Sequence, residues 1–273
     1  MPGKSSADKI EHTISNLEKF WGEKKLKDVT KLNCRAFAST RPQFAARRDL
    51  ETLRADINYW HSEKTPLTFK PKIWLPERAP SRVRWLTHDE ARRLRKAAMA
   101  VPHLYRFIVI GLFTGSRSGA ILSLKWDWVD FERGVMLRKA PGSVEASNKK
   151  KPPVRINPAL LRLLRLWKRK DGKIKWVVHY QGDRVRKLRR SFATAIKAAD
   201  LKGVSAHTLR HTRATWLMQS GTVTPWEAAG SLGMSLKVLE AIYAHHHPDW
   251  QEAAASVGSR AVSVPVGGKS GAR

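Results

Sequence analysis

The segment "HTLRHTRATWLMQSG", residues 207–221, is the most informative stretch of this chain. Its apolar residues recur at helical spacing, which predicts a helix with one side packed on a core. His207 and Arg210 lie three residues apart, so a helix presents both side chains on one face. Both can donate hydrogen bonds to one phosphate, but such pairs are also common on solvated helices. The segment therefore predicts a helix, and it indicates a site only in combination with others.

Helical and β-like segments surround this stretch. Short β-like runs precede it: "GVMLRKA" (134–140), "PVRIN" (153–157) and "IKWVVHY" (174–180). Helical candidates lie on both sides: "LTHDEARRLRKAA" (86–98), "LYRFIVIGLFTGSR" (104–117), "RRSFATAIKAADL" (189–201), "TPWEAAGSLG" (224–233) and "SLKVLEAIYAHHH" (235–247). Thr87 and Glu90 have the spacing of a capping box at the start of the first. The pattern predicts a mainly α fold with a small antiparallel β-sheet, in the α+β class.

The charge of the chain points to a polyanionic partner. The 273 residues include 52 Lys and Arg against 23 Asp and Glu, a formal charge of +29. A basic surface gains affinity by displacing counterions from phosphates, so nucleic acid is the expected partner and a merely solvated surface the alternative. The apolar run "FIVIGLF" (107–113) is too short to span a bilayer, and the N-terminus has no apolar signal core. With Cys34 as the single cysteine, we expect a cytoplasmic protein without membrane association.

The prolines of "FKPKIWLPERAPSR", residues 69–82, mark a boundary between two parts of the chain. We predict a helical DNA-binding domain over residues 1–70 and an extended linker over 71–82. A larger domain is predicted over residues 83–255. Small and polar residues predict a flexible tail over 256–273.

Two further stretches place cations at predicted turns. In "FTGSRSGAIL" (113–122), Arg117 lies among small residues between two apolar runs, so its side chain can enter a cleft. A guanidinium donates two hydrogen bonds to a phosphate and keeps its charge, although an exposed turn arginine is an equally good interpretation. In "SNKKKPPVRIN" (147–157), three lysines lie where a hairpin would turn: Lys149, Lys150 and Lys151. One of them can act as a general acid if its pKa falls, or all can simply touch a DNA backbone.

The last predicted helix ends in "AIYAHHHPDW", residues 241–250. Tyr243 shares this helix with several leucines and an isoleucine, so by itself it is predicted to pack in a core. Adjacent residues of a helix point in different directions, so His245, His246 and His247 would not converge on one metal ion. We interpret the histidines as a helix terminus, where hydrogen-bonding side chains suit the exposed carbonyls.

In this order and at these distances, the segments resemble the tyrosine recombinase (phage integrase) family. "TGSRSGAILSLKW" (114–126) resembles the family's first arginine motif, and residues 207–221 resemble its His-x-x-Arg motif. "SLGMSLKVLEAIYAHHHPD" (231–249) resembles its nucleophile motif, in which a Leu-Gly pair precedes the tyrosine. The resemblance covers residues of about 85–250, which identifies 83–255 as a catalytic domain. Residues of about 10–70 resemble the helical core-binding domain that precedes it.

The resemblance implies a site-specific DNA recombinase, or integrase, that cleaves and rejoins DNA strands by transesterification. Tyr243 would attack a phosphodiester and form a covalent 3′-phosphotyrosine with a free 5′-hydroxyl. Arg117 and Arg210 would bind the nonbridging oxygens, and His207 would assist as a donor or proton acceptor.

The same resemblance assigns the remaining parts of the reaction. Lys149, with Lys150 as the second choice, would protonate the departing 5′-oxygen. Neither a cofactor nor a metal ion is implied, since cations surround the phosphate and the covalent intermediate conserves bond energy. The implied partner is double-stranded DNA, bound by a homotetramer on two sites in a bacterial or phage-like cytoplasm.

Two positions depart from the family pattern. Met234 stands where the family usually has His or Trp, and a methionine cannot donate a hydrogen bond. Ala120 stands where an acidic residue commonly follows the first arginine. We hypothesise that His245 or His246 replaces the donor missing at Met234.

Two other classes of function compete with this interpretation. Residues 225–243 also resemble a helix-turn-helix, which would make the protein a transcriptional regulator that binds DNA without cutting it. A regulator accounts for the basic composition but not for Arg117, the lysines and the His207–Arg210 pair in this order. A metal-dependent nuclease would need clustered carboxylates, whereas the acidic residues here are sparse and scattered.

Overall fold

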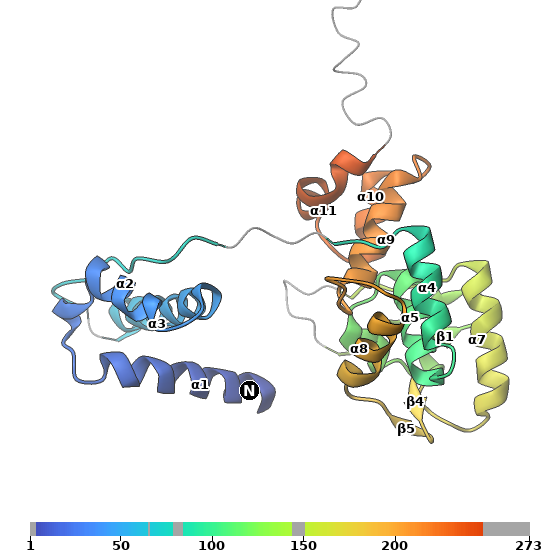
Figure 1. The fold of residues 1–273 in the computed structure, drawn as a ribbon, viewed down its shortest axis with the longest axis horizontal. Coiled ribbons are helices and arrows are strands. Elements are labelled where there is room, and N and C mark those ends of the chain that lie inside the picture. The colour runs from blue at the N-terminus through green and yellow to red at the C-terminus, as the bar shows by residue number, and fades with distance from the viewer. Residues whose placement is uncertain (1–3, 65, 79–83, 144–150, 248–273) are drawn as a thin grey trace, which may run out of the picture. The chain divides into compact units, whose positions relative to one another are not determined.

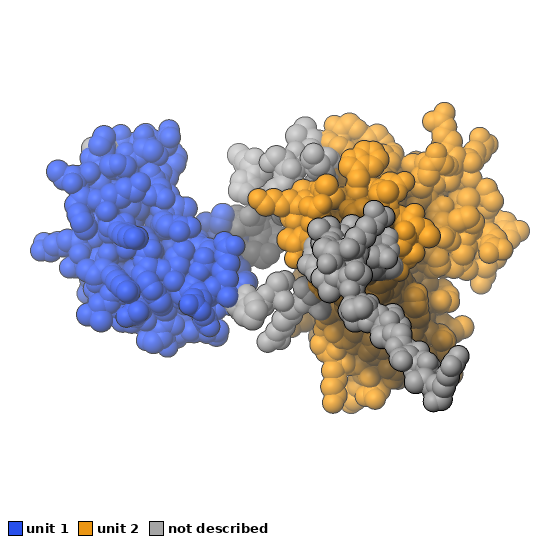
Figure 2. All heavy atoms as spheres, turned by 90° about the horizontal axis from the view of Figure 1, so that it is seen from above, with its two compact units in different colours: residues 1–82 blue, residues 83–273 orange. Residues whose placement is uncertain are grey.

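The structure is a computed structural model, and it describes residues 4–64, 66–78, 84–143 and 151–247. The chain divides into two compact units, unit 1 (residues 1–82) and unit 2 (residues 83–273), which are coloured separately in Figure 2. In the part of the chain that the structure describes, no helix combines the length and the apolar character of a membrane span.

Unit 1 is helical and has its own apolar core. Its elements are α1 (Lys4–Trp21), a 3-10 helix (Leu26–Asp28), α2 (Lys31–Ser39) and α3 (Gln43–Glu63). The core residues are Leu17, Trp21, Val29, Cys34, Phe37, Leu50, Ile57 and Ile73. Three aromatic side chains bring α1 and α2 together, because Phe20 packs edge to face on both Trp21 and Phe37.

The proline-rich segment that follows α3 packs onto unit 1. Residues 66–78 form no helix or strand, in keeping with the extended conformation that their prolines predict. Ile73 is nevertheless buried in the core of unit 1, with Trp74 and Leu75 packed beside it. Part of the predicted linker, residues 71–82, thus packs on unit 1, because proline content reports backbone conformation and not the burial of apolar side chains between the prolines.

Unit 2 is mainly helical, which confirms the predicted α+β class. Its helices are α4 (His88–Ala98), α5 (Pro102–Thr114), α6 (Ser118–Leu122), α7 (Pro158–Asp171), α8 (Arg189–Ala198), α9 (Thr208–Gln219), α10 (Pro225–Leu232) and α11 (Leu236–Tyr243), with short 3-10 helices at Trp126–Trp128 and Ala244–His246. An antiparallel sheet is formed by β1 (Val129–Asp130), β2 (Val135–Met136) and β3 (Val154–Arg155), and a hairpin by β4 (His179–Tyr180) and β5 (Asp183–Arg184).

The local signals in the sequence agree with these elements. Each predicted β-like run contains one short strand: β2, β3 and β4 respectively. The capping box of α4 is confirmed, because Thr87 Oγ1 accepts from the Glu90 N–H at 3.1 Å and Glu90 Oε2 accepts from the Thr87 N–H at 3.0 Å.

Helix α9 lies at the centre of unit 2. It packs along α5 on one side and against α10 and α11 on the other. Both its apolar and its polar residues are buried: Thr208, Leu209, Arg210, Thr212, Ala214, Thr215, Leu217 and Met218. The hydroxyl of Thr212 is satisfied within the protein, since its Oγ1 donates to the Thr208 carbonyl at 2.8 Å and accepts from the Leu86 N–H at 2.9 Å. The sequence predicted one buried side, whereas the structure buries the helix on nearly all sides.

The C-terminal helices form a second, smaller core on the outer side of α9. Its buried members are Ala214, Leu217, Met218, Ala228, Ala229, Leu232, Leu239 and Tyr243. Figure 1 shows α10 and α11, in orange and red, at the end of unit 2 opposite the β4–β5 hairpin. Tyr243 is therefore attached to the rest of unit 2 through the packing of α11 on α9.

A buried ion pair holds α5 against α7. Arg106 donates two hydrogen bonds to Asp171, at 2.6 and 2.8 Å, and a third to the Val177 carbonyl at 2.9 Å. The Trp126 indole also donates to Asp171 at 3.1 Å, and His179 Nε2 lies 3.2 Å from the same carboxylate. Burial raises the pKa of Asp171, but the hydrogen bonds from Arg106 and His179 outweigh burial and leave this pKa below its ordinary value.

Replacing Asp171 by Asn should destabilise unit 2 by about 3–5 kcal/mol, because it leaves the Arg106 charge buried without its partner. Urea unfolding of the full chain measures this loss. The matched control is Asp89→Asn, whose ion pairs with Arg92 and Arg93 are exposed and should contribute less than about 1 kcal/mol. Equal losses in the two variants would contradict a structural role for the buried pair.

Candidate active site

Arg210 lies at the centre of the site, on the first turn of α9. Its residue surface is only 5% exposed. Its Nη1 donates to the Gly115 carbonyl at 2.9 Å and to the Leu232 carbonyl at 2.6 Å. Burial lowers the pKa of Arg210 to about 10, with Arg117 acting in the same direction and Tyr243 against it. The guanidinium therefore stays charged at neutral pH and is held between the end of α5 and the end of α10.

Arg117 reaches the same place from the turn between α5 and α6. Gly115 ends α5 with φ at 60°, and a Cβ there would collide with the Leu232 side chain, so the turn requires glycine. Arg117 is two residues further on and caps α6. Its Nη2 donates to the Gly233 carbonyl at 3.5 Å. Gly115, one of the small residues around Arg117 in the sequence, is thus a condition for the position of Arg117.

Arg138 is a third arginine of the cluster, and the sequence analysis did not single it out. Its residue surface is 4% exposed. It donates to Ser116 Oγ at 2.8 Å, to the Thr114 carbonyl at 2.7 Å and to the Ser231 carbonyl at 2.6 Å. The alternation of an extended chain could have indicated its burial. Residue 138 is two positions after the buried Met136 of β2, and alternate residues of an extended chain share a face.

The three arginines share one turn of the backbone. Arg138, Arg210 and Arg117 donate to the successive carbonyls of residues 231, 232 and 233. These carbonyls end α10, where a helix leaves its last acceptors without intrahelical partners. Gly233 allows this turn by adopting φ at 64°. Burial, together with the charges of Arg210 and Arg117, lowers the pKa of Arg138 to about 9, as expected where cations converge.

Tyr243 lies at the end of α11 with its hydroxyl directed to α9. The residue is 2% exposed, and its hydroxyl shares a hydrogen bond with His211 Nδ1. Burial raises the pKa of Tyr243 to about 12, although Arg210 acts in the opposite direction. The phenol is therefore fully protonated at neutral pH and needs a proton acceptor if it is to act as a nucleophile.

Two histidines of α9 lie between the arginines and Tyr243. His207 is the N-cap residue of the helix, and its ring lies edge-on to that of His211 with centroids 4.6 Å apart. Burial lowers the pKa of His207, and the charges of Arg210 and Arg117 act in the same direction. Burial also lowers the pKa of His211, to about 4, with His207 and Arg210 acting in the same direction. Both imidazoles are therefore neutral at pH 7. Sequence reasoning passed over His211, although it lies one turn after His207.

The remaining predicted residues have different outcomes. Lys149 and Lys150 lie outside the described residues, and Lys151 is half-buried just before Pro152. Met234 is half-buried and packs against the smaller core that contains Tyr243, which fits the packing role expected of a methionine. Ala120 is buried in α6.

Among the three consecutive histidines, His245 and His246 contact each other, with ring centroids 4.0 Å apart. The ring of His246 contacts Trp85, with centroids 5.8 Å apart, and His245 is exposed. The Tyr243 hydroxyl shares its hydrogen bond with His211. The hypothesis that His245 or His246 supplies the donor missing at Met234 stays a prediction. Within residues 4–247, as far as they are described, no group of three or more His, Cys, Asp or Glu side chains could hold a metal ion.

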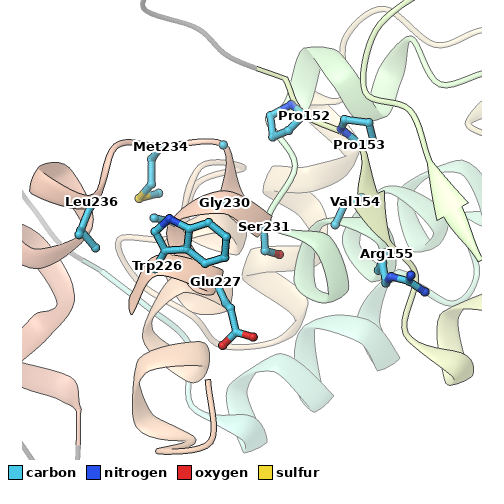
Figure 3. Close-up of a pocket in the computed structure, with 12 residues that line it drawn as sticks. Pro152, Pro153, Val154, Arg155, Trp226, Glu227, Gly230, Ser231, Met234 and Leu236 are labelled. Carbon is cyan, nitrogen blue, oxygen red and sulfur yellow. The ribbon is translucent and has the colours of Figure 1, made fainter. Parts of the chain in front are cut away.

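A groove of about 870 Å³ opens beside the turn at residues 231–233 (Figure 3). Pro152, Pro153, Val154 and Arg155 line one side of it, and Trp226, Glu227, Met234 and Leu236 line the other. Trp226, which lies at the edge of the groove, is 77% exposed. The groove therefore lies between the strand that follows the lysine segment and the helix pair that carries the tyrosine.

Comparison with known proteins places the chain in a family. A model of the phage integrase family matches residues 84–248, which is more than half of the chain. The chain belongs to the phage integrase family. The integrase of Salmonella phage P22 is 29% identical over 186 residues, which cover 63% of this chain and 46% of that protein. This chain thus aligns with less than half the length of that curated relative.

Solved structures share the fold of this integrase-family chain. The Tn1549 transposon integrase in complex with transposon right end DNA has a TM-score of 0.73 at 17% identity, covering 96% of each chain. A lambda integrase dimer bound to a COC′ core site has a TM-score of 0.69 at 17% identity, covering 89% of this chain and 72% of that one. The XerH recombinase bound to difH has a TM-score of 0.67 at 19% identity, covering 90% and 78%. At such identities the likeness shows the fold alone.

Replacing Arg138 by Ala should destabilise unit 2 by about 2–4 kcal/mol, because it removes three hydrogen bonds, two of which are fully buried. The matched control is Arg165→Ala, which removes one exposed hydrogen bond to the Phe131 carbonyl. Urea unfolding of both variants measures the difference. A loss for Arg138→Ala no larger than for Arg165→Ala would show that relief of repulsion among the arginines outweighs the lost hydrogen bonds.

The stability of the chain should rise with pH between about 4 and 6.5. The unfolded chain binds more protons than the folded chain in this window, because folding lowers the pKa of His211 to about 4 and that of His207 below 6.5. Urea midpoints measured across the window test the sign. The dependence should be shallower in His211→Asn, and an unchanged slope in that variant would contradict the burial of a neutral imidazole.

Proposed function

We propose that this chain is a site-specific DNA recombinase that cleaves and rejoins strands through a 3′-phosphotyrosine. The observation that supports this most is the convergence of two buried arginines, Arg138 and Arg210, and the half-buried Arg117 beside the hydroxyl of a buried tyrosine. Cations at this density favour a phosphate between them, and the tyrosine supplies a nucleophile at its edge. Double-stranded DNA is the proposed substrate, in agreement with the charge of +29.

The hydrogen bonds that Arg210 makes to the two carbonyls leave others of its N–H donors for a phosphate. Both carbonyls that it binds are reached by Nη1, and within the described residues its Nε and Nη2 donate to no other group. A nonbridging phosphate oxygen would take these donors while the carbonyls keep the guanidinium in place. Arg117 would bind the second nonbridging oxygen from the neighbouring turn.

The proposed reaction forms one bond to phosphorus and breaks another. The Tyr243 oxygen bonds to phosphorus, the bond from phosphorus to the 5′-oxygen breaks, and the 5′-oxygen takes a proton from a lysine, proposed as Lys149 or Lys150. Rejoining is the reverse attack by a 5′-hydroxyl on the phosphotyrosine. No hydrolysis takes place, so strand joining needs no nucleotide cofactor.

The regulator alternative has weaker support. Helices α10 and α11 do form a helix–turn–helix arrangement, with Gly233 in the turn and Ser235 capping α11. However, Leu239 and Tyr243 of α11 are buried. Three arginines from other parts of unit 2 donate hydrogen bonds to the carbonyls of the turn. A regulator that only binds DNA has no need of these hydrogen bonds.

Self-association is part of the proposal. The lambda integrase neighbour is a dimer bound to a core site. For this chain we propose assembly into a homotetramer on two DNA sites, which would allow strands to be exchanged between duplexes. Molecular mass measured by light scattering with and without a captured site would test this stoichiometry.

Incubating the protein with a random pool of nicked duplexes should yield a covalent protein–DNA adduct that survives denaturing electrophoresis. Tyr243→Phe should form no adduct and should still bind DNA in a gel shift. The matched control is Tyr180→Phe, because Tyr180 is exposed at the β4–β5 hairpin and should leave adduct formation unchanged. Sequencing the captured DNA identifies the site.

Three results would count against this proposal. Equal adduct from wild type and Tyr243→Phe would exclude the nucleophile. DNA binding without any adduct would favour the regulator. Loss of the adduct in EDTA would favour a metal-dependent reaction.

A further inference from the structure

The proposed reaction needs a group that takes the proton of Tyr243, and the structure distinguishes two histidines for this role. His207 belongs to the His-x-x-Arg motif, and its ring contacts the ring of His211. His211 is the residue whose Nδ1 shares a hydrogen bond with the Tyr243 hydroxyl. Proton transfer requires direct contact or one bridging water, so position favours the second histidine.

The packing of α9 and α11 fixes this contact. His211 follows Arg210 by one residue on the central helix, and Tyr243 ends the helix that packs on it. The two rings are tilted by 47° with centroids 5.8 Å apart, so they meet through their polar atoms and not by stacking. Since the pKa of Tyr243 is raised by burial, its hydroxyl is the donor and Nδ1 of His211 the acceptor.

The charges around His211 indicate when it would act. The groups that face it are His207 and Arg210 on α9 and Tyr243 on α11. In the DNA-free protein, burial keeps its pKa at about 4, with His207 and Arg210 acting in the same direction, so it is a weak base. A phosphate bound between the arginines adds negative charge beside the ring and favours its protonation.

We propose that His211, and not His207, accepts the phenolic proton of Tyr243 as the tyrosine attacks the DNA phosphate. This assignment rests on the proposed recombinase function. The proton passes from the Tyr243 oxygen to Nδ1 of His211 while the oxygen–phosphorus bond forms and the bond to the 5′-oxygen breaks. In rejoining, His211 returns the proton to the phenol as it leaves phosphorus. His207 is then free to donate to the phosphate.

The test compares two leaving groups in single-turnover cleavage of a captured site. One substrate has the ordinary 5′-oxygen, and the other has sulfur at that bridging position, which leaves without a general acid. Loss of the acid slows only the oxygen substrate, whereas loss of the base slows both. The ratio of the two rates within one sample does not depend on the folded fraction, so a partly misfolded variant stays informative.

His211→Asn should slow both substrates by about 10²-fold or more and leave their ratio at the wild-type value. Its rate should also rise with pH over a range in which the wild-type rate is flat, since hydroxide then replaces the imidazole. A merely structural role would not change this pH profile. The alanine variants of Lys149 and Lys150 should show which lysine is the acid. The variant that lacks the acid should cleave the oxygen substrate slowly and the sulfur substrate at the wild-type rate. His245→Asn is the matched control and should cleave like wild type.

Two results would overturn the assignment while leaving the recombinase proposal intact. One is wild-type cleavage by His211→Asn. The other is that His207→Asn, and not His211→Asn, slows the cleavage of both substrates equally and gives a cleavage rate that rises with pH. Absence of any adduct from the wild-type protein would instead remove the proposed function, and the assignment with it.

Discussion

The site of this chain depends on three arginine side chains that bind three consecutive carbonyls at the end of α10. Each comes from a different part of unit 2: Arg117 from the α5–α6 turn, Arg138 from the residues after β2, and Arg210 from the central helix. Buried cations repel each other, so they can be held together only where acceptors are concentrated. The end of a helix provides such acceptors, and a glycine at residue 233 lets the chain turn there.

This arrangement links the fold to the chemistry that we propose. The carbonyls hold the arginines in the absence of a phosphate, so the cluster is organised before DNA arrives and little reorganisation is needed. The helix that carries Tyr243 begins three residues after the last of these carbonyls. A change in the turn would therefore displace both the cations and the nucleophile, which is why the Leu-Gly pair of the sequence motif precedes the tyrosine at short range.

Burial has opposite consequences for the two kinds of ionisable group in the site. Arg138 and Arg210 keep their charge at neutral pH, because burial lowers the pKa of these two guanidiniums only to about 9 and about 10. The pKa of Tyr243 rises and that of His211 falls, so their shared proton stays on the phenol until the electrostatics change. In the proposed mechanism, Tyr243 therefore becomes an effective nucleophile only once a phosphate is bound beside His211.

The sequence by itself determined the class of the fold, most of the helices and the order of the motifs, because these depend on local periodicity and capping. Thr87 and Glu90 show this most clearly, since both hydrogen bonds of their capping box involve neighbours in the chain. Arg117 and Arg210 could be proposed from their motifs.

The roles of Arg138 and His211 were decided only by the tertiary structure. Arg138 looked like the end of a short β-like run, and its three partners lie 22 to 93 residues away in sequence. His211 and Tyr243 are 32 residues apart and meet only because α11 packs on α9. Contacts at such separations leave no periodic trace in the sequence, because side-chain packing between helices decides them.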